Sequence, residues 1–105
     1  MSRPFSYNDE NFTVIGNVLF LHFMMINAID RDGNIVEIPP EIYKRMLYKS
    51  NYLLYVKIKD NLTVANMCAV GTRKSLSDEK YYIYSQSGIG TTGAYLVGYY
   101  ILRDI

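Results

Sequence analysis

The sequence predicts a mainly β fold, a compact antiparallel sandwich or barrel of about seven strands with one short helix. Short apolar runs alternate with turn residues, which is the spacing of a small β domain. Leu, Ile, Val, Tyr and Phe dominate the apolar residues, and this composition favours strands over helices. The 105 residues are enough for one domain, so we expect a polar arm at residues 1–11 and a single β domain at residues 12–105.

The strongest strand candidate is VLFLHFMMINAI at residues 18–29. Both of its alternating sets are apolar, so a strand here needs cover on both faces, and another subunit is one source of that cover. The remaining apolar runs complete the set of seven predicted strands, which lie at residues 12–15, 18–29, 35–38, 51–58, 62–70, 81–85 and 94–102.

Turn residues predict how these strands are joined. The sequence DRDGN at residues 30–34 predicts a hairpin turn after the strongest strand, because Asp-Gly tolerates positive φ. Residues 59–61 predict a second hairpin, between the predicted strands at residues 51–58 and 62–70. One segment, residues 40–49, has helical spacing on an apolar face, made by Ile42, Tyr43, Met46 and Leu47.

The segment SGIGTTG at residues 87–93 matches the glycine spacing G-x-G-x-x-G of dinucleotide-binding loops. Such a loop must lead into a helix whose N-terminus receives the pyrophosphate. The next residues, AYLVGYYIL, predict a strand instead. We therefore interpret the glycines as a hairpin loop that needs positive φ, and expect no nucleotide cofactor.

No set of residues predicts catalysis or metal binding. Asp30, Asp32 and Asn34 have the initial spacing of a calcium loop, but Ile35 replaces the required glycine, which favours the hairpin. The chain has one histidine, one cysteine and scattered carboxylates. We therefore predict a protein that is not an enzyme, with no catalytic, cofactor-binding or metal-binding residues and no cofactor.

Charge and hydropathy restrict the partners. Eleven basic and ten acidic residues give a net charge of +1, which argues against nucleic acid and acidic membranes as partners. Basic and aromatic residues alternate at residues 43–59, but an amphipathic helix followed by a strand explains them. The longest apolar run, residues 18–26, is too short to span a bilayer, and the N-terminus lacks a signal-peptide pattern.

The tyrosines predict contacts with other protein subunits. Six of the eleven fall in the last two predicted strands, and four of these form two neighbouring pairs whose members face opposite ways. The chain thus carries more apolar area than one small core buries, and a protein partner would cover the excess. We expect the N-terminal arm and the loops at residues 71–80 and 86–94 to engage neighbours. We expect the interface to include Leu21, Phe23, Met25, Tyr82, Tyr84, Tyr95, Tyr99 and Tyr100.

The polar arm leading into FTVIGNVLFLHFMMINAI, and the final segment GAYLVGYYILRDI, resemble the small virion structural proteins of tailed bacteriophages, of the head-decoration, head-fibre or connector type. The resemblance is one of overall character. It implies a capsid or tail component, assembled in the host cytoplasm as a symmetric homo-oligomer, often a trimer. Two alternatives are a monomeric ligand-binding module that uses surface tyrosines and a small protein-binding regulator, either of them cytoplasmic.

Overall fold

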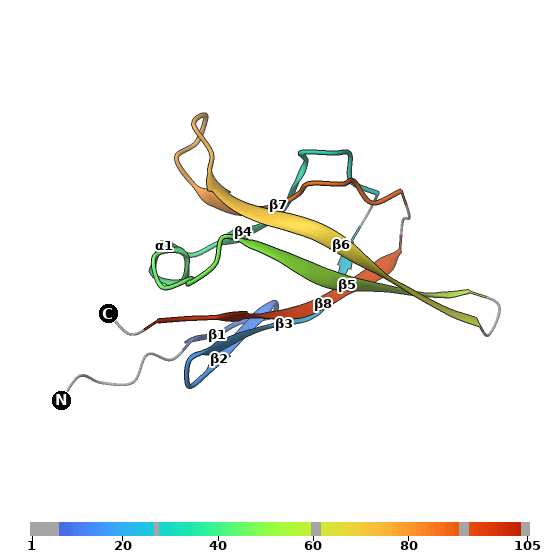
Figure 1. Ribbon diagram of the computed structural model, residues 1–105, viewed down its shortest axis with the longest axis horizontal. Coiled ribbons are helices and arrows are strands. Elements are labelled where there is room, and N and C mark those ends of the chain that lie inside the picture. The colour runs from blue at the N-terminus through green and yellow to red at the C-terminus, as the bar shows by residue number, and fades with distance from the viewer. Residues whose placement is uncertain (1–6, 27, 60–61, 91–92, 104–105) are drawn as a thin grey trace.

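The computed structural model describes residues 7–26, 28–59, 62–90 and 93–103 (Figure 1). The fold is mainly β with one short helix, as the sequence predicts. In chain order its elements are β1 (Tyr7–Asn8), β2 (Phe12–Ile15), β3 (Val18–Ile26), β4 (Asn34–Ile38), α1 (Pro40–Tyr43), β5 (Ser50–Lys59), β6 (Leu62–Lys74), β7 (Tyr81–Ser85) and β8 (Ala94–Ile101).

All eight described strands belong to one antiparallel sheet in the order β1-β2-β3-β8-β5-β6-β7-β4. The sheet curls into a half-barrel, so it is neither a closed barrel nor two stacked sheets. Strands β1 and β4 lie at its two ends. The β5–β6 hairpin extends beyond the rest of the sheet, on the side opposite α1 (Figure 1). The molecule is elongated, with extents of 52 × 32 × 20 Å.

The predicted hairpin between β5 and β6 is confirmed by an unbroken register from Ser50↔Gly71 to Lys59↔Leu62. The predicted hairpin between β3 and β4 is wrong, because β4 pairs with β7 at the far end of the sheet. The turn at Asp32, where φ is +66°, does form. Its backbone bonds to Ser85 of β7 rather than to β3: Asp32 N–H donates to the Ser85 carbonyl at 2.7 Å, and Ser85 N–H donates to the Gly33 carbonyl at 2.9 Å.

Strands β7 and β8 both form, but they do not pair with each other as the predicted hairpin required. Strand β7 lies between β6 and β4, whereas β8 lies between β3 and β5. Of the three connecting glycines, Gly88 and Gly93 adopt positive φ, of +80° and +81°, whereas Gly90 does not. Between them Ile89 forms an isolated bridge with Ile29, which holds the connection against the start of the β4 turn.

The core lies on the inner side of the curled sheet. Its centre consists of apolar side chains with almost no solvent exposure, contributed by β2, β3, β5, β6, β7 and β8, among them Phe12, Leu19, Leu21, Leu53, Val70, Ile83 and Leu96. One end is closed by Ile42 of α1 and by Met46, which bridges to Leu102. The other end is closed by the Ile29–Ile89 bridge.

The helix is shorter than predicted. It ends at Tyr43, and Met46 instead pairs with Leu102 after β8. The Leu47 amide likewise donates to the Ile101 carbonyl at 3.0 Å. The helical spacing of the apolar residues is real, but two of its four members are held by backbone bonds to a distant strand, and these bonds end the helix.

A bulge in β3 changes which of its residues face the core. The register passes from Leu21↔Gly98 to Met24↔Leu96, so one extra residue enters β3 between these pairs. Before the bulge the odd-numbered residues Leu19 and Leu21 face inward, and after it Ile26 is buried. The simple alternation predicted along residues 18–26 therefore fails after Leu21.

Candidate functional site

The candidate site is the outer side of the sheet over β2, β3, β8, β5 and β6. Paired residues of antiparallel strands share a face, so the register identifies the side chains opposite the core. The pairs Phe20↔Tyr99, Leu54↔Val97 and Leu54↔Met67 place apolar residues of four strands side by side. We call this surface the outer face, and it comprises Ile15, Val18, Phe20, Tyr52, Leu54, Val56, Ala65, Met67, Ala69, Tyr95, Val97, Tyr99 and Ile101.

The outer face is apolar and open to solvent. Tyr52 is 65% exposed, Tyr99 59% and Met67 54%, and Ile15, Phe20 and Ile101 are also exposed. None of the outer-face residues carries a charge. Scattered exposed apolar side chains are normal in soluble proteins, but a contiguous apolar patch is typical of an interaction site.

Two hollows adjoin Tyr99, one within this surface and the other at its edge. One, of about 350 Å³, is lined by Asn51, Tyr52, Leu54, Met67, Val97, Gly98 and Tyr99. The other, of about 220 Å³, is lined by Tyr48, Ser50, Asn51, Tyr99, Tyr100 and Ile101. Tyr99 and Asn51 line both hollows.

The hollows arise because β5 and β8 separate. Their register covers only the three pairs from Leu54↔Val97 to Val56↔Tyr95. On the N-terminal side of Leu54 a side chain takes the place of backbone hydrogen bonds between the two strands: the Asn51 side-chain amide donates to the Tyr99 carbonyl at 2.7 Å. The side chains of Tyr52 and Tyr99 thus project from diverging strands, with a depression between them.

Polar groups border the outer face at both sides. On β2 and β3, Thr13 Oγ1 donates to Asn8 Oδ1 at 2.7 Å and also bonds His22 Nε2. Because the Thr13 proton is directed at Asn8, the His22 Nε2–H is the donor to Thr13 Oγ1. On β6 and β7, the Arg73 guanidinium lies over the Tyr84 ring, 4.1 Å from its centroid. An apolar centre with a polar rim is the usual composition of a protein interface.

The residues predicted to form an interface occupy different environments. Leu21 and Tyr100 are only 1% and 3% exposed because they face inward, so they belong to the core and not to the surface. Tyr95 and Tyr99 lie on the outer face. Tyr82 and Tyr84 are half-buried near the β6–β7 end. The side chains of the other two predicted residues, Phe23 and Met25, lie outside the described part of the structure.

Sequence reasoning did not identify several outer-face residues, notably Phe20, Tyr52, Leu54, Met67 and Val97. Each lies opposite another outer-face residue in the register. The available signal was the alternation within each strand, which separates Tyr52 and Leu54 from Leu53. Choosing the exposed set required the strand order, since both sets are apolar.

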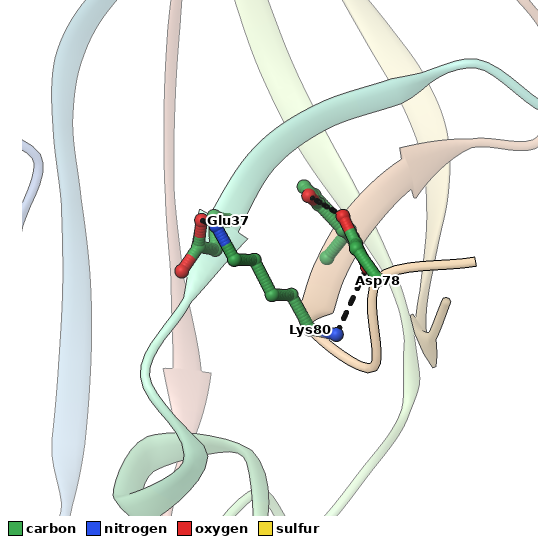
Figure 2. A network of polar contacts seen from close by, with 4 residues as sticks. Glu37, Asp78 and Lys80 are labelled. Carbon is green, nitrogen blue, oxygen red and sulfur yellow. Dashed lines mark hydrogen bonds and ion pairs between the residues drawn. The ribbon is translucent and has the colours of Figure 1, made fainter. Parts of the chain in front are cut away.

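The β6–β7 loop, residues 75–80, is the second exposed apolar feature, with Leu76 95% exposed at its tip. Asp78 organises the loop by accepting the Lys80 amide at 3.0 Å and the Tyr82 hydroxyl at 2.6 Å. Figure 2 shows this loop beside β4, where Lys80 Nζ lies 3.7 Å from Glu37 Oε1. The bond to the Asp78 carboxylate raises the pKa of Tyr82 to about 12.

The other sequence motifs have structural roles. The calcium-like residues of the β4 turn bind a side-chain cation, since Arg73 Nη2 donates to the Asp32 carbonyl at 2.6 Å and to Asn34 Oδ1 at 2.9 Å. The basic and aromatic residues near α1 bind each other: Lys49 Nζ lies 3.9 Å from the Tyr43 ring centroid, and Tyr43 stacks on Tyr81.

Across the described ranges, no group of three or more His, Cys, Asp or Glu side chains has an arrangement that could hold a metal ion. In the same ranges, no helix is long and apolar enough to cross a membrane. No family model, curated protein or solved structure matches this chain.

Proposed function

We propose that this protein is a non-enzymatic assembly subunit whose copies associate through the outer face, and that it serves as a structural component of a tailed-bacteriophage virion. The observation that carries the assembly part is the uncharged apolar surface over β2, β3, β8, β5 and β6. The virion part rests on the resemblance in overall character described above.

Energetics support association through this surface. Phe20, Tyr52 and Tyr99 are between 41% and 65% exposed, which corresponds to roughly 300 Å² of ring surface if a whole aromatic side chain presents about 200 Å². At about 25 cal/mol per Å², covering these rings favours association by several kcal/mol before the entropic costs of binding. The net charge of +1 gives copies little mutual repulsion.

The test is the oligomeric state of the purified protein, measured by sedimentation velocity over a wide concentration range. We expect association in the wild type and its loss in Met67→Glu, which places a charge at the middle of the outer face. The matched control is Leu76→Glu, an equally drastic change at a more exposed apolar residue outside the outer face. We expect this control to associate as the wild type does, because the interface proposed here is the outer face and does not include the loop at residues 71–80 that the sequence analysis expected to engage neighbours.

Two results would contradict the assembly proposal. A wild type that stays monomeric at high concentration would favour the monomeric ligand-binding module instead. Equal association in Met67→Glu and the wild type would move the interface elsewhere. The virion assignment is tested separately, by mass spectrometry of purified phage particles, which must contain the chain in many copies.

A further inference from the structure

We propose that two copies of this chain pair outer face to outer face about a two-fold axis, with Tyr99 of each copy inserted into the hollow between β5 and β8 of the other. This pairing rests on the proposed function, because it names the subunit that covers the outer face and the geometry of the contact.

The absence of charge on the outer face indicates that its partner is also uncharged and apolar. A charged partner surface placed here would lose its hydration without gaining an opposite charge, which costs several kcal/mol per buried ion. An uncharged, apolar partner of similar extent avoids this cost. The outer face of a second copy has this chemistry, and it is present at the same concentration as the first.

The shape of the outer face is self-complementary. An interface about a two-fold axis uses the same patch on both copies, so any projection and the hollow that receives it must lie on that one patch. Tyr99 projects beside a hollow of about 350 Å³ lined by Tyr52, Leu54, Met67 and Val97. An engineered apolar cavity of about 150 Å³ admits benzene, so this hollow has room for a phenol ring.

The geometry also places polar groups where a buried tyrosine needs them. Asn51 lines the same hollow. Its Nδ2 donates to the Tyr99 carbonyl and its Oδ1 accepts the Tyr52 amide, which leaves one N–H and one lone pair for an incoming hydroxyl. Tyrosine is one of the residues enriched at the energetic centres of protein interfaces, because it joins a large apolar ring to a polar tip.

The available area reaches that of a specific interface. The six outer-face side chains that are between 39% and 65% exposed give a footprint of roughly 500 Å² per copy, if a whole large apolar side chain presents about 150 Å². Two such footprints bury roughly 1,000 Å² in total, which is about the minimum for a specific protein–protein interface. The polar groups around Thr13 and Arg73 then form the rim.

Two variants test the contact from its two sides. Tyr99→Ala removes the projection, and Val97→Trp fills the hollow while leaving Tyr99 in place. We expect each to weaken the dimer at least about 30-fold in sedimentation velocity, the effect of losing an energetic centre. Leu76→Ala, which truncates the most exposed apolar side chain, is the control and is expected to dimerise as the wild type does.

Mixing the two variants tests the two-fold geometry itself. Tyr99→Ala retains an open hollow and Val97→Trp retains the projecting ring, so a mixed dimer recovers one of the two contacts. In native mass spectrometry we expect mixed dimers in clear excess over either variant paired with itself. Near-ultraviolet circular dichroism and thermal unfolding of each variant establish that it is folded before mixing.

The outcomes separate this proposal from the previous one. A monomeric wild type overturns both. A wild type that associates, and is disrupted by Met67→Glu but by neither Tyr99→Ala nor Val97→Trp, overturns only the pairing. Trimers without dimers, or folded variants that show no excess of mixed dimers, also overturn the two-fold contact and leave association through the outer face standing.

Discussion

At the scale of single residues, neighbouring tyrosines have opposite roles. Tyr99 projects into solvent, whereas Tyr100, the next residue, is 3% exposed in the core. Among the described residues the Tyr100 hydroxyl has no hydrogen-bond partner. A buried hydroxyl without a partner opposes folding, because it gives up its bonds to water. Burial raises the pKa of Tyr100, since losing hydration destabilises the charged phenolate more than the neutral hydroxyl.

We predict that Tyr100→Phe increases the free energy of unfolding by about 1 kcal/mol at neutral pH, as measured by urea denaturation. The pH dependence has a defined sign. Because the pKa is raised in the folded state, wild-type stability is retained below pH 10.0 and lost as the pH rises above it. The variant should lose less stability in that range. Lower stability of Tyr100→Phe at neutral pH would show that the hydroxyl is satisfied.

At the scale of the elements, Gly98 permits the close packing of β8 against β5. A Cβ at this position would overlap Leu53 Cδ2, and Leu53 is fully buried. The glycine does not have positive φ, so the requirement is one of space. It also lies at the hollow where the two strands separate, which links the packing of the core to the shape of the outer face.

We therefore predict that Gly98→Ala lowers the free energy of unfolding by about 1–3 kcal/mol, the usual cost of overpacking a core. The matched control is Gly90→Ala, where a Cβ would meet nothing within 4 Å. That variant should be neutral or slightly stabilised. Thermal and urea unfolding of both proteins provide the comparison, and equal stability of the two variants would contradict the packing argument.

At the scale of the whole molecule, the half-barrel buries one side of its central strands and leaves the other side exposed to solvent. The inner side holds the core, and the outer side carries no charge over thirteen residues of five strands. Closing the sheet into a barrel would not hide this surface, because the outer side of a barrel also faces solvent. A further layer is needed to cover it, and the proposed assembly would supply that layer.

Because the outer face is uncharged, we predict that self-association is nearly independent of sodium chloride. Raising its concentration from about 0.05 to about 0.5 M should change the dissociation constant less than about three-fold, since screening acts on charges. Sulfate should strengthen association by promoting apolar burial. A loss of association with added sodium chloride would identify a charged contact instead, with the basic residues near α1 as the first candidates.

The amino-acid sequence by itself determined the mainly β class, most strand positions, the β5–β6 hairpin and the glycines with positive φ, because these depend on local alternation and on turn chemistry. Only the tertiary structure decided that β4 pairs with β7, that β7 and β8 are apart, and that α1 ends at Tyr43. It also decided which side of each strand is exposed. The exposed apolar side chains include Tyr52 and Met67, whereas Leu21 and Tyr100, which the sequence analysis expected at an interface, are buried. The physical reason is that long-range pairing and a bulge in β3 set the facing of these strands, and a sequence apolar on both sides does not encode that choice locally.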